Sequence, residues 1–118
     1  MQKPMASFTV HDLEQRVRER AQQAGTEASY TRRLLDGGVE RCARKFGEEA
    51  IETVLAAVSE DRERLIAEAA DLIYHLLVML AARGIALADV EAELAARTRQ
   101  SGLAEKASRS RKSQAESD

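Results

Sequence analysis

The sequence predicts an all-α protein, a helical bundle built around an antiparallel helical hairpin, with a core completed by dimerisation. The 118 residues contain a single proline, Pro4, and no segment shows the apolar and polar alternation of a β-strand. Aromatic residues make up only 3% of the chain, so the core must be aliphatic. A small core of this kind gains stability when a second copy of the chain covers another apolar face.

The bulk composition favours a folded protein of the cytoplasm. A formal net charge of −2, from 18 basic and 20 acidic residues, gives no sign of a surface for nucleic acid or anionic lipid. The single cysteine, Cys42, cannot form an internal disulfide, which suits a reducing compartment. The longest apolar run, residues 76–82, is far shorter than the roughly 20 residues that span a bilayer. We therefore expect no nucleic acid and no membrane among its partners.

The amino-terminal third is expected to hold one long helix and one short helix. The long helix runs from about residue 10 to about residue 25, with Ser7 or Thr9 as its N-cap. A short turn of helix follows over residues 29–35, and its first three residues can cap or start it. The glycine pair at positions 37 and 38 then breaks this helix.

The centre of the chain predicts two long helices joined by a tight turn. They run from about residue 39 to 58 and from about residue 62 to 82, with Asp61 as a plausible N-cap of the second and Gly84 as its C-cap glycine. Each helix has a seam of apolar residues at helical spacing, along which we expect the two to pack antiparallel. The seams consist of Val39, Ala43, Phe46, Ala50, Val54 and Val58, and of Leu65, Ala69, Leu72, Leu76 and Leu80.

A shorter helix is expected over residues 87–98, and the sequence after it is polar and rich in Ser, Lys, Arg and Ala. Such a composition is typical of a solvated tail. We therefore expect one all-α domain over residues 1–99 and a polar, partly disordered tail over residues 100–118.

Four acidic residues are placed symmetrically about Glu60, in the middle of the expected turn. Glu52 and Glu68 are equidistant from it, and so are Glu49 and Asp71. Each helical residue rotates by about 100°, which places both acids of each helix on the same flank of its seam. If the helices pack antiparallel, the four carboxylates converge along one edge of the hairpin.

Carboxylates that crowd together repel one another, so this arrangement calls for a cation. Oxygen-only ligands favour Mg²⁺, Mn²⁺ or Ca²⁺ over zinc, and Mg²⁺ commonly shares its coordination sphere with substrate phosphates. The expected metal ligands are Glu49, Glu52, Glu68 and Asp71. The alternative to a metal site is that these acids form a solvated face on a non-catalytic helical dimerisation module.

Three neighbours of the acids have two interpretations each. Lys45 lies one turn before Glu49 and can bind a phosphate or form an ion pair with Glu49. Glu48 can bind metal or orient a ligand. His75 follows Asp71 by one turn, and a hydrogen-bonded histidine at the edge of the core is favoured over a substrate contact.

The segments KFGEEAIETVLAA and DRERLIAEAADLIYHLLVMLAARGI resemble phosphoribosyl-ATP pyrophosphohydrolase, also called phosphoribosyl-ATP diphosphatase. This family is part of the all-α, MazG-like superfamily of nucleoside triphosphate pyrophosphohydrolases, whose pattern is EExxE, a spacer, then ExxD. The segments FTVHDLEQRVRER, SYTRRLL and RTRQSGLAEKASR extend the resemblance from Phe8 to about Arg109.

The resemblance implies a Mg²⁺-dependent, nucleotide-binding homodimer that hydrolyses 1-(5-phosphoribosyl)-ATP to 1-(5-phosphoribosyl)-AMP and pyrophosphate, the second step of histidine biosynthesis. A house-cleaning pyrophosphohydrolase of the same superfamily, acting on ordinary or damaged nucleotides, is the alternative enzyme. The four acids would hold the metal, and Glu48 would contribute or assist water activation. The implied catalytic residues are Glu48, Glu49, Glu52, Glu68 and Asp71, and the candidate substrate contacts are Ser29, Tyr30, Thr31, Arg33 and Lys45.

Overall fold

The computed structural model describes residues 7–23, 29–59 and 61–99, and all regular structure within these ranges is helical. The all-α prediction is therefore confirmed. The helices α1 (Val10–Gln22), α2 (Tyr30–Asp36), α3 (Gly38–Val58) and α4 (Arg62–Ala82) belong to a compact unit that ends at Leu87. A further helix over residues 87–99 belongs, from Ala88 onward, to a second unit. The predicted tail, residues 100–118, lies outside the described residues.

Local capping chemistry starts the helices at the expected places. Thr9 and Asp12 form a capping box on α1, in which each side chain accepts a hydrogen bond from the backbone of the other, at 2.9 and 3.1 Å. Ser29 caps α2 and Asp61 caps α4, and each accepts from a backbone N–H three residues on. Helix α1 ends at Gln22, and its predicted end near residue 25 lies outside the described residues.

Two glycines with positive φ shape the ends of the long helices. Gly84, with φ of 69°, follows α4, and the Ile85 N–H bonds back to the Leu80 carbonyl at 2.9 Å. This is the Schellman arrangement, which satisfies the last carbonyls of the helix, and it confirms Gly84 as the C-cap glycine. Gly38, with φ of 83°, turns the chain directly from α2 into α3.

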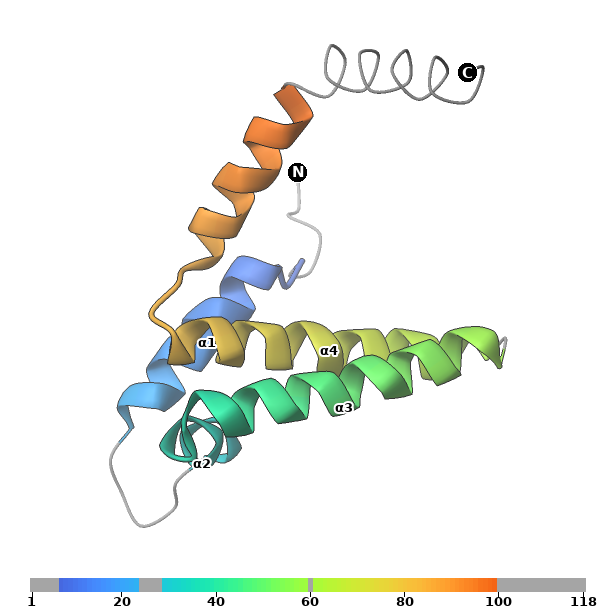
Figure 1. Ribbon diagram of the computed structural model, residues 1–118, viewed down its shortest axis with the longest axis horizontal. Coiled ribbons are helices and arrows are strands. Elements are labelled where there is room, and N and C mark those ends of the chain that lie inside the picture. Colours follow the sequence, from blue (N-terminus) through green and yellow to red (C-terminus); the bar gives the residue numbers. More distant parts are fainter. Residues whose placement is uncertain (1–6, 24–28, 60, 100–118) are drawn as a thin grey trace, which may run out of the picture. The chain divides into compact units, whose positions relative to one another are not determined.

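Helices α3 and α4 form the antiparallel hairpin, as Figure 1 shows, and α1 crosses α4 near the carboxyl end of α4. The short helix α2 lies beside the beginning of α3. The core is at this end of the hairpin, where Val17, Leu34, Cys42, Leu77 and Val78 are each at most 3% exposed. The turn residue Glu60, the centre of the acidic pattern, lies outside the described residues.

The predicted packing seam of α3 is wrong at both ends, because Val39 and Ala43 are exposed as well as Val54 and Val58, and only Phe46 and Ala50 are half-buried. Val54 and Val58 are 60% and 72% exposed, whereas Cys42, Glu49 and Ala56 are the buried residues of this helix. The side of α3 that carries the acids therefore faces α4. Within the described residues, no helix covers the aliphatic side near the turn, because α1 and α2 pack at the other end of the hairpin (Figure 1).

Helix α4 is long and apolar enough to cross a bilayer by length and composition, with a mean hydropathy of 1.8. It also carries Glu68 and Asp71 in its middle, and charged side chains at the centre of a bilayer are costly. Its buried residues Leu77 and Val78 pack against α1 and α2. We therefore interpret the apolar composition as that of the central helix of a folded bundle.

Candidate functional site

The acidic residues meet between α3 and α4. One carboxylate oxygen from each of Glu49, Glu68 and Asp71 lies within 4.8 Å of the other two. The carboxylate of Glu52 interacts with those of Glu49 and Glu68. The structure thus brings together the four acids that the sequence spacing placed on one flank. Glu49 is buried and Glu68 half-buried, whereas Glu52 and Asp71 are exposed.

A hydroxyl group ties the two helices together at the level of the acids. Thr53 Oγ1 lies 2.8 Å from the Glu49 carbonyl on its own helix and 3.1 Å from the Glu68 carbonyl on α4. Its proton is shared between two carbonyls, which fixes the register of α3 against α4 where the carboxylates meet. Sequence reasoning missed Thr53, although its place one turn after Glu49 on a helix was a usable signal.

Burial and mutual repulsion disfavour the ionised carboxylates of the cluster. Burial, followed by the neighbouring Glu52, raises the pKa of the Glu49 carboxyl above its ordinary value. Burial also raises the pKa of Glu68, and the charges of Glu52 and Asp71 add to the effect. The Oε2 atom of Glu68 is shielded from solvent and has no hydrogen-bond partner in the described part of the chain. A buried carboxylate oxygen without a donor, among hard oxygen ligands, fits a divalent cation.

Lys45 lies at the edge of the cluster and pairs with acids on its own helix. Its Nζ atom is 3.3 Å from Glu48 and 4.0 Å from Glu49, so the ion pair considered from the sequence is present. The hydrogen bond to Glu48 raises the pKa of Lys45 and keeps it cationic. Together with Arg41 and Arg44, and with the acids Glu40 and Glu48, it lines a pocket of about 420 Å³ in which basic side chains outnumber acidic ones.

His75 connects the acid-bearing helix to α2. Its Nδ1–H donates to the Asp71 carbonyl at 2.7 Å, and its Nε2 is hydrogen-bonded to the Tyr30 hydroxyl at 3.0 Å. The ring is 5% exposed, which confirms the expected hydrogen-bonded histidine of the core edge. The two bonds hold Tyr30 beside the segment of α4 that presents Asp71.

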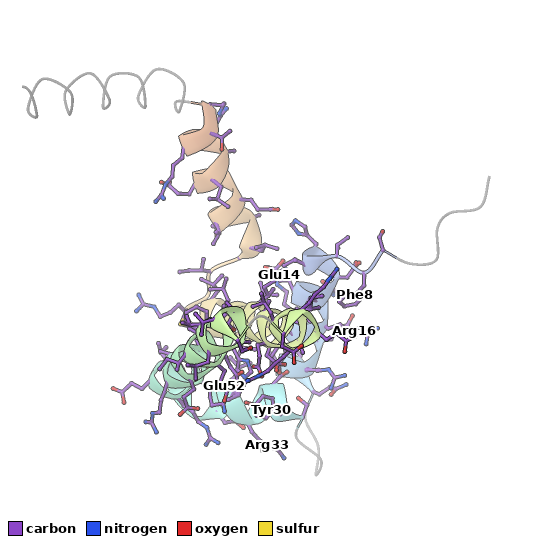
Figure 2. The ribbon with its side chains drawn as sticks, turned by 90° about the vertical axis from the view of Figure 1, so that its right-hand side faces the viewer. Phe8, Glu14, Arg16, Tyr30, Arg33 and Glu52 are labelled. Carbon is purple, nitrogen blue, oxygen red and sulfur yellow. The ribbon has the colours of Figure 1, made fainter. Side chains whose placement is uncertain are left out.

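Of the remaining candidate substrate contacts, two are buried or half-buried and two are exposed. Ser29 is the N-cap of α2, and Thr31 is 1% exposed with its hydroxyl hydrogen-bonded to that of Tyr74. Ser29 thus starts α2, and Thr31 connects α2 to α4 through Tyr74. Tyr30 and Arg33 are exposed, and Figure 2 shows both projecting from the region of α2.

Comparison with known proteins gives a consistent result over most of the chain. A family model described as phosphoribosyl-ATP pyrophosphohydrolase matches residues 10–98. Phosphoribosyl-ATP pyrophosphatase 1 of Bradyrhizobium diazoefficiens is 64% identical over 105 residues, which cover 89% of this chain and 98% of the relative. The protein of the same name from Rhodopseudomonas palustris is 59% identical over 107 residues, with coverage of 91% and 99%. Phosphoribosyl-ATP pyrophosphatase of Nitrobacter hamburgensis is 57% identical, with the same coverage.

Proposed function

Because the chain belongs to the phosphoribosyl-ATP pyrophosphohydrolase family, we propose that it hydrolyses 1-(5-phosphoribosyl)-ATP to 1-(5-phosphoribosyl)-AMP and pyrophosphate. This is the second step of histidine biosynthesis, and the protein carries it out in the cytoplasm. The observation that supports the chemistry is the convergence of carboxylates from α3 and α4 on one point. Such a cluster suits the hydrolysis of a phosphoanhydride, whose charge has to be neutralised before water can attack.

The metal ligands in this proposal are the four acids of the cluster, Glu49, Glu52, Glu68 and Asp71. When bound there, Mg²⁺ or Mn²⁺ neutralises triphosphate oxygens and lowers the pKa of a coordinated water. Binding also removes two unfavourable features of the metal-free cluster, namely the crowding of negative charge and the unpartnered Glu68 Oε2. The cluster and the substrate thus require the same ion.

The chain's own groups position the phosphates and the water. Lys45, with the neighbouring Arg41 and Arg44, offers cationic contacts for the β- and γ-phosphates, which depart as pyrophosphate. In this proposal Glu48, which is exposed and pairs with Lys45, assists activation of the attacking water by accepting its proton. Water adds to the α- or the β-phosphorus, the bond from that phosphorus to the bridging oxygen breaks, and the bridging oxygen leaves on the other product, pyrophosphate or 1-(5-phosphoribosyl)-AMP respectively.

The decisive experiment measures pyrophosphate release from 1-(5-phosphoribosyl)-ATP with and without Mg²⁺, in parallel with a panel of dNTPs. We expect Mg²⁺-dependent turnover of the phosphoribosyl substrate, and a large loss of kcat in Glu52→Gln and Asp71→Asn. Glu63→Gln, an exposed acid in the first turn of α4, serves as the charge-matched control. Faster hydrolysis of dNTPs would assign the chain to nucleotide house-cleaning. Near-normal kcat in both cluster variants would refute the ligand assignment.

We also propose that the protein is a homodimer assembled on the uncovered side of the hairpin. Ile51, Val54, Leu55 and Val58 of α3 are each more than half exposed, as is Ile66 of α4. Exposed aliphatic side chains gathered on adjoining helices are typical of a protein–protein interface. A second copy supplies a complementary apolar surface of the same kind. Sedimentation of the wild type and of Val54→Glu tests this, because a monomeric wild type would exclude the proposal.

A further inference from the structure

A second cavity near α1 combines positive charge with aromatic rings. It has a volume of about 310 Å³, and its lining includes Phe8, Arg16, Arg20, Tyr30 and Tyr74. Tyr30 and Tyr74 stack with ring centres 6.2 Å apart, which gives the cavity an ordered aromatic wall. The pocket beside Lys45 differs in kind because no aromatic side chain lines it.

The two arginines of this cavity are available for an anionic ligand. The guanidinium carbon of Arg16 lies 6.0 Å from the centre of the Phe8 ring, and Figure 2 shows the two residues on the same edge of α1. Within the described residues, no carboxylate lies at ion-pair distance from Arg16 or Arg20. Both side chains are exposed at the cavity. A phosphate could therefore bind without displacing a protein ion pair.

The cavity adjoins a pocket that is lined by an acid of the cluster. This adjoining pocket of about 320 Å³ shares Phe8 and Tyr74 with it and reaches Asp71. Tyr30, on the wall of the first cavity, bonds His75, which in turn bonds the Asp71 carbonyl. A ligand that occupies both pockets would thus run from the cluster to the two arginines along aromatic surface.

We infer that this cavity binds the phosphoribosyl arm of the substrate, with its terminal phosphate on Arg16 and Arg20. The inference rests on the proposed function, whose substrate carries anionic groups at two ends. The triphosphate suits the pocket that contains Arg41, Arg44 and Lys45, whereas the base and the added ribose suit a wall of aromatic rings. Arg16 and Arg20 are then the residues that distinguish phosphoribosyl-ATP from ATP, since ATP lacks the phosphoribosyl group and its terminal phosphate.

The test compares Arg16→Gln and Arg20→Gln with Arg18→Gln, which removes the same charge from another face of α1, where Arg18 pairs with Glu14. For each protein, kcat and KM are measured with phosphoribosyl-ATP, and Ki is measured for ATP as a competitive inhibitor. We expect the two pocket variants to raise KM by about 10- to 100-fold, the usual loss for one charged hydrogen bond, with ATP Ki unchanged. Arg18→Gln should retain both constants.

The outcomes separate this inference from the proposed function. An unchanged KM in both pocket variants, or equal increases of KM and of ATP Ki, would overturn the assignment of the pocket while leaving the hydrolase intact. A wild type that turns over no phosphoribosyl-ATP would overturn the function instead. In that case calorimetry with ribose 5-phosphate decides on the pocket, because binding must be lost in the Arg16→Gln/Arg20→Gln double variant and absent with ribose. Binding that survives the double substitution contradicts the inference.

Discussion

The Glu49→Gln variant should be more stable than the wild type without metal and less stable than the wild type with Mg²⁺. The change is Glu49→Gln, which keeps the shape of the side chain and removes its charge. In the metal-free protein the carboxylate oxygens of Glu49, Glu68 and Asp71 lie within 4.8 Å of one another. Two negative charges at this distance repel by about 1 kcal/mol in bulk water and by about 3.5 kcal/mol at the effective dielectric of a protein surface. We therefore predict that the variant is the more stable protein by about 1 to 3 kcal/mol when chelator is present.

Metal should invert that order. At a free Mg²⁺ concentration 100 times its Kd, binding adds about 2.7 kcal/mol to the free energy of unfolding of the wild type. The variant has lost one charged ligand of four, and a Kd raised about 100-fold leaves it a gain of only about 0.4 kcal/mol. Mg²⁺ therefore stabilises the wild type by about 2.3 kcal/mol more than the variant, and the order reverses wherever the advantage of the variant in chelator is smaller than this difference.

The assay is urea denaturation at neutral pH, followed by circular dichroism at fixed protein concentration, with chelator or with a series of Mg²⁺ concentrations. Glu63→Gln provides the control for charge loss on an exposed helical turn, and its response to Mg²⁺ should equal that of the wild type. Equal stabilisation of wild type and Glu49→Gln by Mg²⁺ would refute the reasoning. So would a variant that is the less stable protein in chelator.

Three further predictions concern the same region. The pKa values of Glu49 and Glu68 are raised in the folded state, so the metal-free folded protein binds more protons than the unfolded chain. Its free energy of unfolding should therefore fall as pH rises from about 4 through those raised values. Urea midpoints measured across this pH range should decrease with pH, and the double variant Glu49→Gln/Glu68→Gln should show a smaller decrease. Tyr30→Phe removes the hydrogen bond to His75 and should lower the free energy of unfolding by about 1 kcal/mol, measured with chelator; an unchanged midpoint would contradict the bond. Thr53→Val should weaken Mg²⁺ binding several-fold in calorimetry, whereas Thr53→Ser should retain it.

The helix boundaries were predictable because they depend on local chemistry. Thr9, Ser29 and Asp61 each offer an oxygen to backbone N–H groups that no preceding turn can satisfy, and each starts a helix at the expected residue. The convergence of the acids was predictable for a related reason. Once two helices flank a tight turn, the spacing about Glu60 sets both the level and the angle of each carboxylate.

The inward face of α3 was not predictable from periodicity. The helix is apolar on one side and acidic on another, and periodicity alone favours the apolar side as the contact with α4. The structure has Glu49 buried and Val58 exposed. Thr31 shows the same limit on a smaller scale, because a polar residue in a short helix looks like a ligand contact until its partner, Tyr74, is known. Both outcomes depend on contacts distant in sequence.

The two unusual faces of α3 have a single physical origin. A hairpin of two helices has one inner line of contact, and placing Glu49 on that line sends Val54 and Val58 outward. The acids cannot be moved to the solvent side without separating the α3 carboxylates from those of α4, which would dissolve the cluster. The aliphatic side must then find its cover outside the described hairpin, and a second copy of the chain is the cover that the proposed homodimer supplies. On this argument, metal binding and dimerisation are consequences of one choice of helix rotation. A substitution that rotates α3, such as a charge at Thr53, should impair both together.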